Sequence, residues 1–107
     1  MIPGSHFVII FDKQVERQIL AIDRQDRSMI LDAIEQQLSF DANIHTRNRK
    51  PMRIPNSLGA TWELRCGINN RYRVFYDIDP EEQIVIVLAI GRKLGNRLFI
   101  GNEEFIL

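Results

Sequence analysis

Arginine and lysine residues are concentrated in the middle of this chain, where they could bind an anion. Residues 42–76 carry seven Arg and Lys side chains and a single carboxylate, Glu63, for a net charge of +6. Residues 1–41 and 77–107 each have a net charge of −3, so the zero net charge of the whole chain conceals this separation. A guanidinium presents forked donors that match phosphate oxygens, so such a segment is typical of an anion-binding face. The alternative for a short cluster is a solvated charge run, but here the basic residues continue from a loop into expected strands.

Two of these arginines, Arg65 and Arg73, are expected to face each other across a pair of strands. Residues 62–67 and 72–78 alternate apolar with polar side chains, which predicts two half-buried strands. Four apolar residues must share the core face: Trp62, Leu64, Val74 and Tyr76. A three-residue loop at 68–70 keeps all four on that face and places Arg65 directly opposite Arg73.

The face that carries Arg65 and Arg73 is expected to be open. Glu63 and Phe75 are their neighbours on it, and Tyr72 belongs to the core by the same alternation. Like charges that face each other destabilise a strand pair, so the two arginines point to an absent anion, although nearby carboxylates could partly neutralise them. We therefore expect removal of Arg73 to relieve repulsion and to leave stability unchanged or slightly raised.

Two helices are predicted before the basic segment, after an apolar, β-branched strand at residues 6–11. Asp12 can cap a first helix that ends near Asp23, and Asp26 can cap a second that ends near Phe40, because apolar residues recur at helical spacing in both. The predicted core combines these helices with the sheet: Ile30, Ile34, Leu38, Trp62, Leu64, Val74, Tyr76, Ile86 and Leu88.

The remaining segments complete an α+β prediction. Residues 41–60 have no periodicity, whereas residues 84–90 are apolar at every position, which is typical of a central strand covered on both faces. Residues 97–107 are expected to form a last strand or a packed extension. The order β-α-α-β-β-β predicts a twisted, mainly antiparallel sheet with a helical hairpin on one face, in a single domain over residues 1–107.

Three short stretches carry a resemblance to a known family. They are Trp62-Glu63-Leu64-Arg65, Tyr72-Arg73-Val74-Phe75-Tyr76 and Leu88-Ala89-Ile90-Gly91-Arg92-Lys93, and the opening Phe11-Asp12-Lys13 also fits. In this order the chain resembles, over nearly its whole length, the RelE/ParE toxins of bacterial type II toxin–antitoxin modules. The resemblance implies the RelE-like fold and a toxin that a cognate antitoxin, encoded nearby, holds inactive.

The resemblance implies one of two targets. RelE-like members cleave mRNA in the ribosomal decoding site, and their basic residues fall here on Arg65, Arg73 and the Arg92-Lys93 pair. ParE-like members inhibit DNA gyrase and have no catalytic residues. This chain departs from the RelE-like pattern twice, with Glu63 where a basic residue is expected and Phe99 where a tyrosine is expected.

RNA cleavage by its own 2′-hydroxyl needs a base, charge stabilisation of the phosphorane and an acid for the leaving 5′-oxygen. Arg65 and Arg73 suit phosphorane stabilisation, and Arg92 or Lys93 can add positive charge. Glu63 can serve as the base, or it can instead form a salt bridge to one of the arginines. Contacts to RNA are expected from Arg47, Arg49, Lys50, Arg53, Arg71, Phe75 and Phe99, with a solvated mobile loop as the alternative for the loop residues.

Other chemistries find little support in the sequence. The two histidines and Cys66 have no metal-ligand spacing, and no Gly-rich phosphate loop or serine-nucleophile signature is present, so no metal or cofactor is expected. Cys66 falls on the core face. No apolar run approaches the roughly 18 residues of a membrane helix, no secretory signal is visible, and one lone cysteine is typical of the reducing cytoplasm.

The sequence thus leads to a ribosome-dependent mRNA endoribonuclease as first hypothesis. The alternatives are a non-enzymatic toxin that binds gyrase and a degenerate member that retains only antitoxin binding. In each case we expect an antitoxin tail, acidic or amphipathic, to lie across the basic face or along the helical hairpin.

Overall fold

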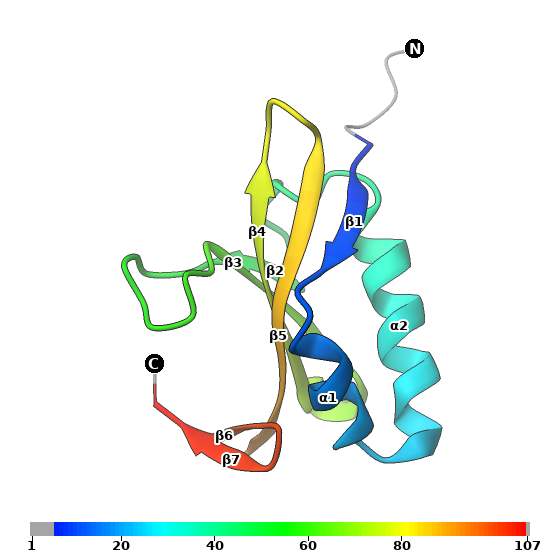
Figure 1. Cartoon of the computed structure of the whole chain (residues 1–107), viewed down its shortest axis with the longest axis vertical. Helices are drawn as coiled ribbons and strands as arrows, with labels where there is room; N and C mark the ends of the chain where they lie inside the picture. Colours follow the sequence, from blue (N-terminus) through cyan, green and yellow to red (C-terminus); the bar gives the residue numbers. More distant parts are fainter. Residues whose placement is uncertain (1–5, 107) are drawn as a thin grey trace.

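Two helices cover one face of a twisted sheet in the computed structural model, which describes residues 6–106 (Figure 1). The elements follow the chain in this order: β1 (Val8–Phe11), α1 (Val15–Leu20), α2 (Arg24–Leu38), β2 (Arg49–Pro51), β3 (Trp62–Cys66), a 3-10 turn (Ile68–Asn70), β4 (Tyr72–Asp79), β5 (Ile84–Leu94), β6 (Arg97–Ile100) and β7 (Glu103–Phe105). Strands β2 to β7 pair in sequence order as an antiparallel sheet, and β1 adds to β5 in parallel. The predicted α+β class and RelE-like strand–helix order are confirmed, with β2 as an addition and with the tail forming two strands, β6 and β7.

The main core lies between the sheet and the helical hairpin. It contains the predicted residues of α2 and of strands β3 and β4, all nearly inaccessible to solvent except Trp62, which is partly buried and stacks on Tyr76. Two predicted core residues of β5 do not reach this core, because the strand is bulged opposite the step from Phe75 to Tyr76: Leu88 packs against a second apolar cluster instead, and Ile86 belongs to neither cluster. The bulge reverses the alternation, so Val85, Val87 and Ile90 are the β5 residues that pack under the helices.

The helical hairpin begins and ends at slightly different residues from those predicted. The first helix ends at Leu20 rather than near Asp23, and Arg27 donates hydrogen bonds to the carbonyls of Leu20 (2.9 Å) and Ile22 (3.0 Å) beyond its last turn. Asp23 is the N-cap of α2 in place of Asp26. Asp26 lies in the first turn and accepts a hydrogen bond from the Tyr72 hydroxyl, which ties α2 to β4.

The side chain of Gln18 supplies a missing hydrogen-bond partner on the side of β5 that pairs with β1 and β6. Strand β1 pairs with residues 84–87 and β6 with residues 91–94, so Ile90 between them has no strand partner on that side. Its backbone N–H donates instead to the Gln18 side-chain carbonyl at 2.8 Å. A buried donor without an acceptor costs about 1–3 kcal/mol.

Replacing Gln18 with alanine is therefore expected to lower the free energy of unfolding by about 1–3 kcal/mol, as measured by urea denaturation. Gln25→Ala, at an exposed position of α2, is the matched control and should change stability little. Equal stabilities for the two variants would contradict this role of Gln18.

Candidate active site

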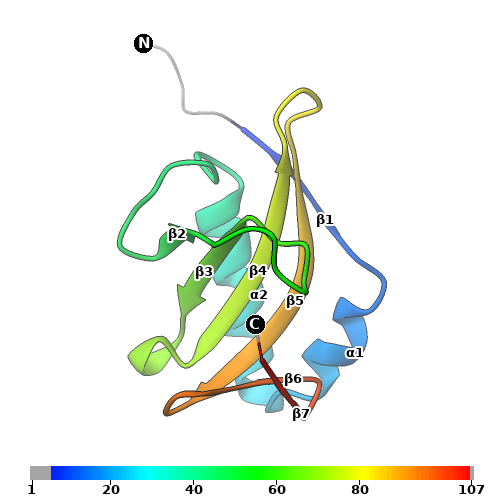
Figure 2. The same cartoon turned by 90° about the vertical axis from the view of Figure 1, so that its left-hand side faces the viewer.

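A groove lies on the face of the sheet opposite the helices, where β3, β4 and β5 meet the β6–β7 hairpin. Figure 2 views the molecule from this side, with α2 behind the sheet. It has a volume of about 310 Å³. Its walls come from β3, β4, β5 and the C-terminal hairpin. The lining residues from the three central strands are Glu63, Arg65, Arg73, Phe75 and Lys93.

Strands β3 and β4 place Glu63 between two arginines. Arg65 faces Arg73 in the predicted register, across a Ile68–Asn70 turn in which Asn69 and Asn70 have positive φ. The Arg65 Nε atom lies 2.8 Å from Glu63 Oε1, and the Arg73 Nε atom lies 4.0 Å from Glu63 Oε2. Glu63 thus forms the ion pair that the sequence offered as an alternative to a catalytic base, and it offsets the repulsion between the two guanidiniums.

The Arg73 side chain is covered more than the sequence indicated. It is only 11% exposed, against 34% for Arg65, and its Nη1 donates to the backbone carbonyl of Asn70. Burial lowers the pKa of Arg73, while Glu63 opposes that shift and Arg65 adds to it. The expectation of a freely open face at Arg73 is therefore corrected: its guanidinium is fixed in direction before any ligand binds.

Strand β5 brings Lys93, but not Arg92, to the groove. The strand runs on to Leu94, four residues beyond its predicted end, and the Lys93 backbone N–H donates to the Arg71 carbonyl at 2.7 Å. Because successive side chains of a strand point to opposite faces, Arg92 lies on the other side. It lines a small depression there with Phe99, its partner in β6. The expectation that Arg92 shares a face with Arg65, Arg73 and Lys93 is wrong for this reason.

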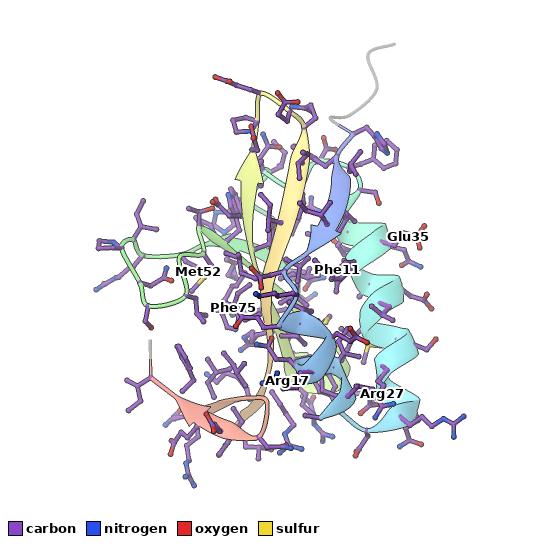
Figure 3. All side chains as sticks on the ribbon, viewed as in Figure 1. Phe11, Arg17, Arg27, Glu35, Met52 and Phe75 are labelled. Carbon is purple, nitrogen blue, oxygen red and sulfur yellow. The ribbon has the colours of Figure 1, made fainter. Side chains whose placement is uncertain are left out.

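Phe75 is buried, so the prediction that a base or an antitoxin segment packs on it is wrong. Its side chain is 1% exposed and belongs to a second apolar cluster with Ala60, Ala89 and Leu98. Met52 packs against this cluster from the loop that folds over the sheet (Figure 3). The loop is held by the side chain of Asn56, which bonds to the backbone of Arg53, Leu58 and Ala60. This cover could not be predicted, because residues 41–60 have no periodicity.

The basic residues that were predicted to contact RNA lie in different environments. Arg49 donates to the carbonyls of Ile44 (3.1 Å) and Gln37 (2.9 Å) and to the Gln37 side chain, so it anchors the loop to α2. Lys50, in β2, lies directly opposite Glu63 of β3, so its side chain is on the same face of the sheet as the groove. The other three, Arg47, Arg53 and Arg71, are exposed and do not line the groove.

The C-terminal hairpin supplies groove residues that the sequence did not single out: Asn96, Arg97, Leu98, Glu104, Phe105 and Ile106. Gly91 lets β6 approach β5, because a Cβ atom there would lie 2.9 Å from the Leu98 side chain and 3.0 Å from the Phe99 carbonyl oxygen. The tail was expected only as a strand or a packed extension. The one sign that it could contribute charged groups to a site was the presence of Arg97 followed by two glutamates, Glu103 and Glu104.

The remaining reactive groups lie outside the groove. Burial raises the pKa of the Cys66 thiol to about 11, which suits a packing residue and not a nucleophile. The His6 ring packs against Phe40 in a tilted arrangement, with 5.0 Å between ring centres. Within residues 6–106, no three His, Cys, Asp or Glu side chains are grouped so that they could hold a metal ion. No helix in the same residues is long and apolar enough to span a membrane.

The groove therefore combines fixed positive charge with one carboxylate. Arg65 and Arg73 can bind two oxygens of a phosphate, Lys93 can donate a proton or add charge, and Glu63 can accept a proton. These are the group types that an RNA-cleaving site or a polyanion-binding site requires.

Comparisons with known proteins place this geometry in context. A family model described as "ParE toxin of type II toxin-antitoxin system, parDE" matches residues 6–95. The chain is also similar to a chain in the crystal structure of the toxin–antitoxin complex RelBE2 from Mycobacterium tuberculosis, with 24% identity and a TM-score of 0.65. That match covers 87% of this chain and 94% of the other, and it shows a shared fold. No curated protein sequence matches the chain.

Proposed function

Because the chain belongs to the family of ParE toxins of type II toxin–antitoxin systems, we propose that it acts as a toxin that cleaves mRNA on the ribosome. The observation that carries the proposal is the groove in which Glu63, Arg65, Arg73 and Lys93 meet. Two guanidiniums, an ammonium and a carboxylate in one groove provide each group that phosphodiester cleavage by a neighbouring hydroxyl requires.

In the proposed reaction, the 2′-hydroxyl of the RNA attacks the adjacent phosphorus. Glu63 takes the hydroxyl proton as the new oxygen–phosphorus bond forms, and Arg65 and Arg73 stabilise the additional negative charge on the phosphorane oxygens. The bond from phosphorus to the 5′-oxygen then breaks, and Lys93 protonates the departing oxygen. The products are a 2′,3′-cyclic phosphate and a free 5′-hydroxyl, with no change in oxidation state.

The ion pairs of Glu63 are compatible with this role. Both of its carboxylate oxygens face guanidiniums, at 2.8 Å from Arg65 Nε and 4.0 Å from Arg73 Nε. A phosphate competes for the same donors, because it too accepts two parallel N–H bonds from one arginine. Substrate binding would then release Glu63 from its partners and place it beside the phosphate as a base.

We further propose that an antitoxin encoded beside this gene neutralises the toxin. The similar RelBE2 structure is a complex of toxin and antitoxin. Besides the basic groove, this chain offers an apolar groove of about 330 Å³ along the helical hairpin, where Phe11, Leu20 and Leu31 are 46%, 60% and 41% exposed. An amphipathic antitoxin segment would cover these side chains.

Expression of the chain alone is expected to arrest growth, and co-expression with the neighbouring gene product is expected to restore it through a complex that co-purifies. Charged substitutions at Leu20 and Leu31 should weaken that complex if the antitoxin lies along the hairpin. Free growth at high expression, with no binding by any neighbouring product, would contradict the antitoxin proposal.

Inhibition of DNA gyrase is the second candidate. Two observations favour it: the matching family model carries the ParE description, and Phe99 stands where the RelE-like pattern has a tyrosine. Induction in cells separates the candidates. Ribosome-phased mRNA ends with undamaged DNA support RNA cleavage, whereas a DNA damage response with intact mRNA supports gyrase as the target and contradicts the proposal.

A further inference from the structure

We infer that Arg97 is an additional phosphate-binding arginine at the rim of the groove, and that Glu104 occupies it until an RNA phosphate replaces the carboxylate. This inference rests on the proposed RNA substrate. Arg97 and Glu104 both border the groove that holds Arg65, Arg73 and Lys93. The strand register places their side chains on the Phe99 face of the hairpin, so they form the outer rim of the groove and not its floor. Neither residue falls within residues 6–95, over which the family model matches.

The contact between Arg97 and Glu104 has the geometry of a phosphate contact. The Arg97 Nε atom donates to Glu104 Oε2 at 3.0 Å, and Nη2 donates to Oε1 at 2.9 Å, so two parallel bonds join the pair. A phosphate presents two oxygens to a guanidinium in the same way. The Arg97 guanidinium carbon also lies 5.2 Å from the centre of the Phe99 ring, which favours one orientation of the guanidinium plane.

Exposure makes this pair exchangeable. The side chains of Arg97 and Glu104 are 64% and 42% exposed, whereas that of Arg73 is 11% exposed. Solvent-exposed ion pairs stabilise a fold little, so Glu104 can leave Arg97 at small cost. The hydrogen bond from Arg97 lowers the pKa of Glu104, so the carboxylate stays charged and competes with incoming phosphate near neutral pH.

The hairpin can keep its place when the pair opens. Leu98 is 8% exposed and packs in the apolar cluster around Phe75, and Phe105 packs against the same cluster. Strands β6 and β7 also pair through their backbones over Leu98–Ile100 and Glu103–Phe105. Arg97 can therefore exchange partners without unfolding the rim.

The test is binding of a short, single-stranded 2′-O-methyl RNA, which cannot be cleaved, to the full chain and its variants by fluorescence anisotropy. Arg97→Ala should weaken binding about tenfold and reduce the slope of log affinity against log salt by about 0.7. Glu104→Gln should tighten binding by up to about fivefold. The double variant should bind like Arg97→Ala, because Glu104 acts only through Arg97.

Glu81→Gln, which removes a carboxylate from the exposed β4–β5 turn, controls for net charge. A purely structural role predicts that Arg97→Ala and Glu104→Gln both weaken binding, and that result would overturn the inference. If Arg97→Ala binds RNA like the unsubstituted chain, the inference about Arg97 is also wrong, but the proposed function is not contradicted. Absence of any RNA binding by the unsubstituted chain would overturn both.

Discussion

Replacing Arg73 with alanine is expected to reduce the rate of RNA cleavage about a hundredfold or more and to abolish toxicity. The guanidinium is held by the Asn70 carbonyl and lies beside Glu63, so its donors point into the groove before the substrate arrives. Loss of one such preorganised donor has an effect of this size on charge stabilisation in the transition state. The measurement is the single-turnover cleavage rate, together with growth after induction.

Stability of the Arg73 variant must be measured beside its activity. Removal of the side chain loses the hydrogen bond to Asn70 and the ion pair with Glu63. It also removes the repulsion from Arg65 and the cost of burying a charge. We expect these terms to offset each other to within about 1–2 kcal/mol. The Arg73→Lys variant keeps the positive charge but loses the paired N–H donors of the guanidinium, so it should remain folded and still cleave RNA slowly.

Arg24→Ala, at an exposed position at the start of α2, removes one positive charge away from the groove and should retain full activity. A folded Arg73→Ala variant that remains fully toxic would contradict the catalytic assignment and favour gyrase as the target.

Replacing Phe75 with alanine is expected to lower the free energy of unfolding by about 3–5 kcal/mol. The Phe75 ring is 1% exposed and forms the centre of the cluster that joins the sheet, the 52–60 loop and the C-terminal hairpin. Its removal leaves a cavity beneath the groove and loosens the packing of the loop and the hairpin against the sheet. Chemical denaturation monitored by circular dichroism measures the loss.

Phe40→Ala serves as the control for Phe75, because Phe40 is 50% exposed, and its effect should stay below about 1 kcal/mol. If the Phe75 variant keeps its stability and loses only RNA affinity, the ring is a stacking surface for a base and does not hold the second cluster together.

The sequence was sufficient to predict the strand pair that builds the site. The even-numbered apolar residues of β3 and β4 share a face, and this parity gave the three-residue turn and the Arg65–Arg73 pairing that the structure has. The same argument failed in β5, where residues 84–90 are all apolar and the bulge at Leu88 leaves no trace in the pattern. Alternation carries information only where polar residues mark the other face.

The contacts of the 41–60 loop and of the C-terminal hairpin could not be predicted for a different reason. Met52 and Leu58 reach Phe75 from an aperiodic loop, and Arg49 is directed to α2 by hydrogen bonds to distant carbonyls. Such contacts depend on how the loop crosses the sheet, which local propensity does not determine. Arg97 and Glu104 lie seven residues apart, and only the turn between β6 and β7 brings them together.

The most direct test of the central claim is a cleavage assay with purified ribosomes, a defined mRNA and the full chain, with chemical analysis of the new ends. We predict cuts only in ribosome-bound mRNA, with 2′,3′-cyclic phosphate and 5′-hydroxyl ends, and loss of the cuts with Arg73→Ala but not with Arg24→Ala. Intact mRNA after incubation with a folded chain that arrests growth in cells would contradict the assignment of the groove as an RNA-cleaving site.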